Sequence, residues 1–465
     1  MMYMASPRAA GTIALLLACA VVLAPSQRAQ LNIEAFRTKI RKIVADGAAP
    51  SLPVAVARNG EIVWSEAFGF ADREARVAAT VETPYSIASL TKPFTATALM
   101  ILEARQRLGL DDPLSRYLGT LERPGVSASG DVTLRRSLGH VAGFPVHYQY
   151  FFDDQSDRPL SFADTMRCYG AEIQKPGSRY TYSNLGFGAL GETVARVSGQ
   201  PYRDFLAREV FAPLGLKRAS VPERAEEAVT AAKRYGRDGS LLPFYVTDFP
   251  GGSAVFASVE DVVRFGSFHA GALMAGQRAV LTPASVTAMQ QKGTGDYGLG
   301  WSVNSNWNTH TVIWHSGAMP GSAATLWLVP AEKIAIAVVA NQIAAPVNQL
   351  AGEILADLLP AGRPTAGSPA PEEAKPSTPV PTPRATDHST GRYRGRLMTC
   401  PKPEMLAIDV QRPGEVQLTL GAASPRLLDG KFTGGRLWME FSSATGSTKS
   451  QCSSQTFDYF LEGFA

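Results

Sequence analysis

The chain has 465 residues, a formal net charge of +4 at pH 7 and 45% hydrophobic residues, without a block of basic side chains. So small a charge does not indicate nucleic-acid binding, whereas the hydrophobic fraction suffices for a sizeable core and the length favours two domains. No histidine pair and no cysteine cluster has the spacing of metal ligands, so we expect a protein that uses neither a metal nor another cofactor.

Residues 1–29 have the pattern of an export signal. The apolar stretch 11–24 follows a basic residue and is too short to span a bilayer comfortably. Leu16–Cys19 also resembles a bacterial lipobox, but the apolar residues that continue past this cysteine argue against lipidation. We expect cleavage after Ala24 or Ala29, a periplasmic or secreted location and no stable membrane span.

The first folded elements are a helix and a hairpin. Apolar residues at helical spacing predict a helix over 33–44. The segments 52–58 and 61–68 predict two strands joined by Asn59-Gly60, a pair typical of a primed two-residue turn.

A serine and a lysine stand at the start of the next predicted helix, 89–104. Residues three apart share a helix face, so the amine of Lys92 can reach the hydroxyl of Ser89. Serine needs such a base at neutral pH, and a helix N-terminus favours negative charge on a nearby oxygen. Pro93 fits the first turn, where its missing N–H costs little. Taken alone, the pattern is equally typical of a capped core helix with a solvated lysine.

The segment 177–186 predicts a turn, a short extended piece and a loop that can orient side chains. Tyr182 can relay a proton if a cation such as Lys92 lowers the pKa of its phenol, and Asn184 can bind a substrate carbonyl or orient the lysine. By itself, this segment is more typical of a turn with a half-buried tyrosine.

Two apolar runs, 324–329 and 334–339, predict a second hairpin. In the strand before it, a backbone N–H can bind an oxyanion, and the small Ser316 and Gly317 leave room for an extended substrate. His315 alone would be interpreted as structural. It gains weight because it follows the serine–lysine and tyrosine motifs in order.

The end of the chain predicts a separate unit. Residues 360–390 are proline-rich and have the composition of a semi-extended linker. Within 391–465, the runs 406–410, 416–420 and 437–441 alternate as strands do and predict a small β module. It is either a packing or solubility appendage, which we favour, or a wall-binding or substrate-gating module.

The cysteines are consistent with an exported protein. Cys19 would leave with the signal, while Cys400 and Cys452 can pair in an oxidising compartment. This arrangement leaves Cys168 unpaired and buried.

Together these motifs resemble the serine β-lactamase and D,D-peptidase superfamily, specifically the class C β-lactamase-like branch that includes D-aminopeptidases and carboxylesterases. The resemblance runs from about residue 33 to about residue 358 and is closest at 84–96, the family's nucleophile segment. Val141 and Ala142 depart from its His-Thr-Ser-Gly-Leu-Pro turn. Further segments that resemble family landmarks are 110–118, 134–145 and 297–301.

The resemblance implies an α+β fold for residues 30–359. The two predicted hairpins would join one antiparallel sheet flanked by helices, with a mainly helical insertion and the active site at the junction. The small C-terminal β module would follow.

The resemblance also implies roles for the residues. Ser89 would be acylated, with Lys92 and Tyr182 sharing the proton transfers. Asn184 would help to hold the substrate. The backbone N–H groups of Ser89 and Ala318 would bind the oxyanion.

His315, Ser316 and Gly317 would line the substrate site. Class C β-lactamases usually carry Lys-Thr-Gly there, and a histidine is mostly neutral near pH 7 whereas a lysine keeps its charge for a substrate carboxylate. We therefore favour a D-amino-acid peptide or a carboxylester as the small-molecule or peptide substrate, with peptidoglycan as one source. A β-lactamase is an alternative. So is a catalytically idle protein that binds peptidoglycan fragments or a partner, although the intact motifs disfavour it.

Overall fold

The structure is a computed structural model, and it describes residues 31–119, 132–156, 158–170 and 172–359, together with the backbone of five strands between 391 and 439. The predicted export signal, the linker and the pairing of Cys400 with Cys452 lie outside the described residues. The division of the chain at residues 30–359, 360–390 and 391–465 stays a prediction. Of the described helices, none has both the length and the apolar character needed to cross a membrane.

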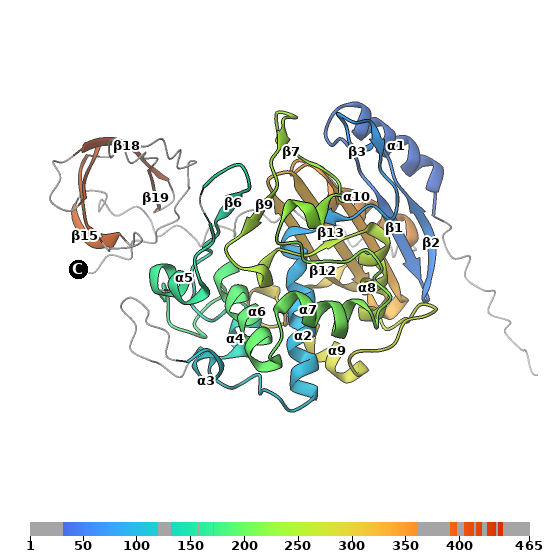
Figure 1. The fold of residues 1–465 in the computed structure, drawn as a ribbon, viewed down its shortest axis with the longest axis horizontal. Coiled ribbons are helices and arrows are strands. Elements are labelled where there is room, and N and C mark those ends of the chain that lie inside the picture. Colours follow the sequence, from blue (N-terminus) through green and yellow to red (C-terminus); the bar gives the residue numbers. More distant parts are fainter. Residues whose placement is uncertain are drawn as a thin grey trace, which may run out of the picture.

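A six-stranded antiparallel sheet lies at the centre of the fold, in the order β11-β12-β13-β14-β1-β2 (Figure 1). Its N-terminal hairpin pairs with its C-terminal hairpin through β1 and β14, with Val54 opposite Val338. The two predicted hairpins therefore do join one sheet. The strands are β1 (Val54–Arg58), β2 (Glu61–Glu66), β11 (Ser302–Trp307), β12 (His310–Met319), β13 (Ser322–Val329) and β14 (Ile334–Ala340).

The turn between β1 and β2 confirms the predicted primed geometry. Asn59 and Gly60 have φ of 54° and 81°, the left-handed values that match the twist of a two-residue hairpin. A Cβ on Gly60 would lie 2.5 Å from the carbonyl oxygen of Leu273. Only glycine therefore fits at this position.

Alternating side chains of the sheet divide the core into two layers. Val54 and Val56 pack in the layer that contains α1 (Ile33–Ala45) and α10 (Val347–Leu358). The smaller Ala55 and Ala57 face the layer that contains α8 (Val259–His269). Small residues allow close packing there, and a Cβ on Gly266 of α8 would lie 2.6 Å from Cδ1 of Leu326.

Helices dominate the chain between the two hairpins. At their centre is α2 (Thr91–Ala104), which is buried from Thr91 to Leu102 and packs against α6. The other helices of this region are α3 (Leu114–Leu118), α4 (Leu134–Leu138), α5 (Phe162–Tyr169), α6 (Asn184–Ser198), α7 (Tyr202–Leu206) and α9 (Pro283–Met289). Paired short strands complete it: β3 (Phe70–Asp72) with β4 (Val77–Ala78), β5 (Tyr85–Ser86) with β10 (Phe256–Ala257), β6 (Tyr150–Phe152) with β9 (Tyr245–Thr247) and β7 (Arg234–Tyr235) with β8 (Leu241–Leu242).

The predicted loop over 177–186 is wrong from Asn184 onward, because α6 begins there. Ser183 caps the helix, and its Oγ accepts a hydrogen bond of 2.9 Å from the N–H of Gly186. Glycines weaken the helix signal in the sequence. Packing requires them: a Cβ on Gly188 would lie 2.5 Å from the ring of Phe249.

The strands beyond residue 390 form a five-stranded antiparallel meander. Three of them, β16, β17 and β19, coincide with the predicted runs, whereas β15 and β18 were not predicted. Their bounds are β15 (Gly391–Leu397), β16 (Glu404–Arg412), β17 (Glu415–Leu420), β18 (Arg426–Thr433) and β19 (Arg436–Met439).

Cys168 on α5 is buried, as expected, but it is disulfide-bonded. The expectation that it is unpaired is therefore wrong. Spacing along a sequence does not determine which cysteines meet in the folded chain.

Candidate active site

Ser89 lies in η1 (Ala88–Leu90), a short 3-10 turn that leads into α2. The predicted helix therefore begins two residues later, at Thr91. Strand β12 lies directly against this turn: a Cβ on Gly317 would be 2.1 Å from the oxygen of Ile87 and 2.8 Å from the nitrogen of Ser89. Glycine is thus the residue that lets β12 approach the serine.

Ala318 presents its backbone to the open side of β12. The two-residue turn after Met319 makes Met319 and Ser322 a hydrogen-bonded pair, so Ala318 and Ala323 form a non-hydrogen-bonded pair. The N–H of Ala318 consequently points away from β13. Pairing with β11 ends at Trp314, so no strand of the described residues pairs with this edge at Ala318.

Lys92 is fully buried, and its amine lies at the centre of the site. Its Nζ is 3.1 Å from Oγ of Ser89, 2.8 Å from Oδ1 of Asn184 and 3.0 Å from the carbonyl oxygen of Gly252. A neutral amine fits these partners well. Its two N–H groups can donate to the amide and carbonyl oxygens, while its lone pair accepts from the hydroxyl of Ser89.

Burial lowers the pKa of Lys92 well below its usual range. All three hydrogen-bond partners are uncharged, so no carboxylate offsets the cost of desolvating an ammonium. The site therefore favours the amine, which is the form that can accept a proton from Ser89.

Tyr182 differs from the expectation. Burial raises the pKa of its phenol, and a hydrogen bond with Ser89 opposes this shift only in part. Nζ of Lys92 lies over the ring, 4.7 Å from its centroid, but no lowering of the Tyr182 pKa by this lysine is found. The expected lowering of the Tyr182 pKa is therefore wrong, and the phenol keeps its proton near neutral pH.

Asn184 reaches the lysine from the first turn of α6. Its backbone N–H donates a hydrogen bond of 3.1 Å to the carbonyl oxygen of Val146, while its Oδ1 accepts a hydrogen bond from Lys92. Of the two functions proposed from the sequence, orienting the lysine is the one that these contacts support.

His315 is only 4% exposed, and both of its ring nitrogens are engaged. Nδ1 donates 2.7 Å to the oxygen of Ser316, so Nε2 accepts 2.9 Å from the hydroxyl of Tyr297. Burial, with a smaller effect of Lys92, lowers the pKa of His315 to about 3. The expectation of a neutral histidine is confirmed, but both ring nitrogens are hydrogen-bonded to other groups of the protein rather than offered to a substrate.

His140 supports the site from behind. Its Nδ1 accepts 3.1 Å from the N–H of Ser183, the residue that caps α6. Its ring packs 4.4 Å from the ring of Tyr182 and 4.7 Å from that of Tyr297, measured between centroids. Sequence reasoning missed these tyrosine partners of His140, because they come from distant segments.

Sequence reasoning also missed the turn that supplies the third partner of Lys92, η4 (Pro250–Gly252). Oγ1 of Thr95, one helical turn after Lys92, lies 2.7 Å from the oxygen of Gly251 and 2.6 Å from the hydroxyl of Tyr202. A threonine at i+3 from the lysine is a weak local signal for this contact.

We expect Thr95→Val to lower the free energy of unfolding by about 1–3 kcal/mol, because it leaves two buried polar groups without a partner. It should also slow the acylation of Ser89, since η4, which holds Lys92 through Gly252, would lose the hydrogen bond from Thr95 that helps to fix it to α2. Thr95→Ser keeps the hydroxyl and should restore both properties. Urea denaturation and labelling rates measure them. Equal behaviour of the two variants would contradict this role.

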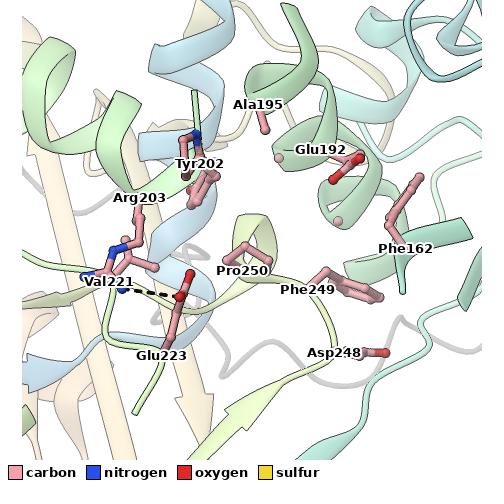
Figure 2. A pocket seen from close by; sticks show the side chains of 13 residues that line it. Phe162, Glu192, Ala195, Tyr202, Arg203, Val221, Glu223, Asp248, Phe249 and Pro250 are labelled. Atoms are coloured by element: carbon pink, nitrogen blue, oxygen red, sulfur yellow. Dashed lines mark ion pairs between the residues drawn. The ribbon is translucent and has the colours of Figure 1, made fainter. Parts of the chain in front are cut away.

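Two cavities flank the segment around η4, and neither is lined by Ser89 or Lys92. The first, of about 300 Å³, lies between α6, α7 and η4. Figure 2 shows the ion pair of Arg203 and Glu223, 3.3 Å apart, on one side of it and Phe162 and Glu192 on the other. The second, of about 350 Å³, includes Met319 in its lining and therefore adjoins the end of β12.

No group of three or more histidine, cysteine, aspartate or glutamate residues in the described part of the chain is arranged to hold a metal ion.

Comparison with known proteins agrees with this geometry. The sequence profile of the Beta-lactamase family matches residues 36–358, a range that contains every residue of the site. The chain belongs to the Beta-lactamase family. The resemblance inferred from the motifs is confirmed, and a hydrolase is supported.

Two relatives illustrate the similarity to this Beta-lactamase family member. "Penicillin-binding protein 4*" of Bacillus subtilis (strain 168) is 26% identical over 289 residues, covering 58% of this chain and 63% of the relative. "Protein flp" of Staphylococcus aureus (strain MRSA252) is 24% identical over 317 residues, covering 65% and 62%. The chain thus spans a little over three fifths of the length of each.

Solved structures confirm the fold. A penicillin-binding protein homologue from Pyrococcus abyssi has a TM-score of 0.61 at 22% identity, covering 93% of this chain and 97% of that one. A class C β-lactamase has a TM-score of 0.61 at 19% identity, covering 70% and 96%. A β-lactamase/D-alanine carboxypeptidase from Pseudomonas syringae has 0.60 at 19%, covering 70% and 98%. The predicted antiparallel sheet flanked by helices is that of the β-lactamase/transpeptidase fold.

Proposed function

We propose that this protein cleaves a D-amino-acid peptide or a carboxylester through an acyl-enzyme on Ser89. The observation that carries the proposal is the 3.1 Å contact between Oγ of Ser89 and a fully buried Lys92 whose other two partners are uncharged oxygens. This environment produces an amine that can act as a base, which a solvated lysine would not be. Membership of the Beta-lactamase family supports the same chemistry.

In the first step, the lone pair of Lys92 accepts the hydroxyl proton while Oγ of Ser89 bonds to the substrate carbonyl carbon. The N–H groups of Ser89 and Ala318 stabilise the oxyanion. As the C–N or C–O bond to the leaving group breaks, that group takes the proton of the Tyr182 phenol. Tyr182 is then reprotonated by the ammonium of Lys92. Water, losing a proton to the same pair, hydrolyses the acyl-enzyme and regenerates the serine.

A neutral His315 favours peptides and esters over β-lactams in this proposal. Its nitrogens bind Ser316 and Tyr297, so the site lacks the permanent cation that a lysine there would offer to a substrate carboxylate. A panel of D-alanyl peptides, short-chain p-nitrophenyl esters and a chromogenic cephalosporin distinguishes the classes. Fastest turnover of the cephalosporin would instead favour a β-lactamase.

Ser89→Ala tests the nucleophile. We expect the wild type to form one covalent adduct with a fluorophosphonate, with a Ser89 Oγ–P bond formed and fluoride released, and the variant to form none. Turnover of every cleaved substrate should fall by a factor of at least about 10⁴.

The exposed Ser115 on α3 provides the matched control, and Ser115→Ala should keep both labelling and turnover. Mass spectrometry of the intact protein and of its peptides locates the adduct. Full turnover by Ser89→Ala would overturn the proposal.

A further inference from the structure

One segment, 146–152, crosses from the helical region to the end of β12. At its start, the carbonyl oxygen of Val146 accepts a hydrogen bond of 3.1 Å from the N–H of Asn184. Its end forms β6, which pairs with β9. Between them, Nε2 of His147 lies 2.6 Å from Oδ2 of Asp248. The segment is therefore attached to the start of α6 at one end and to β9 at the other.

Tyr148 is the side chain of this segment that packs against chain neighbours of the candidate catalytic residues. Its hydroxyl donates to the sulfur of Met319 and also hydrogen-bonds with Ser253. Its ring packs on the cluster of Ala88, Tyr245 and Met319. Ala88 directly precedes the nucleophile, and Met319 directly follows the oxyanion donor Ala318.

The second cavity lies immediately beyond Tyr148. Ser253 and Met319, the two residues that its hydroxyl contacts, are part of the lining of this cavity of about 350 Å³. The remaining lining is mainly apolar, as at Val221 and Phe256, and it also includes the charged residues Arg158, Glu223 and Asp248. The phenol of Tyr148 thus stands between the serine and an apolar space large enough for a long acyl chain.

The two ends of the groove have different roles in the proposed reaction. Tyr182, which would protonate the leaving group, packs on His140, and His140 packs on Tyr297, the partner of His315. This places the leaving group toward the His315 end of the strand. The acyl group then extends toward Met319 at the other end, where Tyr148 stands.

From this placement, and on the basis of the function proposed above, we infer that Tyr148 determines which acyl groups the enzyme accepts. With the phenol in place, short acyl groups such as acetyl fit beside Ser89. Without it, the mainly apolar cavity opens toward Ser89 and admits long alkyl chains. Tyr148 is a specificity-determining residue, and the natural substrate is a short-chain acyl ester or amide.

The test compares kcat/KM for p-nitrophenyl octanoate and p-nitrophenyl acetate. We expect the octanoate-to-acetate ratio to rise at least about tenfold in Tyr148→Ala, because each methylene placed in an apolar pocket contributes about 10-fold or more to discrimination. Tyr148→Leu replaces the alanine variant if that variant folds poorly. It keeps an apolar side chain in the cluster and should give a smaller rise in the ratio. Tyr148→Phe keeps the bulk and should retain the wild-type ratio.

Phe152→Ala is the matched control from the same segment. Its ring lies 5.1 Å from the ring of Tyr245, between centroids, in the same aromatic cluster. Phe152→Ala should keep the wild-type octanoate-to-acetate ratio. The inference would be overturned if this ratio rose as much in Phe152→Ala as in Tyr148→Ala, or if it stayed unchanged in both Tyr148→Ala and Tyr148→Leu. Fluorophosphonate labelling separates failure of this inference from failure of the proposed function. An unchanged ratio with Ser89 labelled rejects only the role of Tyr148. If the protein shows no labelling and no turnover, the proposed function is rejected as well.

Discussion

Replacement of Lys92 with methionine should lower the acylation rate of Ser89 by a factor of up to about 10⁴ at neutral pH. Methionine fills much of the space of the lysine stem but has no lone pair that takes the serine proton. The loss should appear in the burst rate with an activated ester and in the rate of fluorophosphonate labelling.

Lys175→Met is the control for this change, because Lys175 is exposed and the same two side chains are exchanged outside the candidate site. It should leave the acylation rate at the wild-type value. If Lys92→Met were acylated as fast as the control, the lysine could not be the base.

The pH profile follows from the same burial. Because the pKa of Lys92 is lowered well below its usual range, the amine is already populated at pH values where a solvated lysine is protonated. Activity should rise as the pH rises through this lowered pKa and then level off. Because the pKa of Tyr182 is raised, its phenol should not ionise until well into the alkaline range. A wide plateau in kcat/KM is therefore expected.

Adding one methyl group at Gly317 should also slow acylation, by a different route from the loss of Lys92. The new Cβ of Gly317→Ala would lie 2.1 Å from the oxygen of Ile87 and 2.8 Å from the nitrogen of Ser89. All the groups it meets are backbone, so β12 and the nucleophile turn must separate. We expect acylation to fall at least about 100-fold, because a displacement of about 1 Å suffices for such a loss.

A second glycine separates this clash from the general effect of the substitution. Gly352 lies in α10, where a Cβ would make ordinary contact, at 3.5 Å, with the ring of Trp327. Gly352→Ala should keep full activity and, as a helical position, gain up to about 1 kcal/mol of stability. Wild-type labelling of Gly317→Ala would show that the groove does not depend on this close approach.

Much of the framework was predictable because it depends on neighbours in the chain. The turn at Asn59-Gly60, the two hairpins and the first helix follow from alternation and turn chemistry that act within a few residues. The proximity of Ser89 and Lys92 is also local, since positions i and i+3 share one face of a helical turn.

Other features could not be derived from local patterns. The start of α6 at Asn184 was missed because its glycines lower helix propensity, and they are needed only because Phe249 and η4 pack against them. The disulfide bond of Cys168 likewise depends on which segments meet. Tyr148 carries no motif, and its position beside Met319 results from the pairing of β6 with β9.

The sequence by itself predicted which residues would carry the proposed chemistry, that is a serine, its lysine, a tyrosine and a strand with a glycine. Only the tertiary structure decided their protonation and orientation. Burial lowers the pKa of Lys92 well below its usual range, raises the pKa of Tyr182 and lowers the pKa of His315, whose Nε2 is bound to Tyr297. The physical reason is that motif spacing is set along the chain, whereas desolvation and hydrogen-bond partners come from segments up to 160 residues away, as between Lys92 and Gly252.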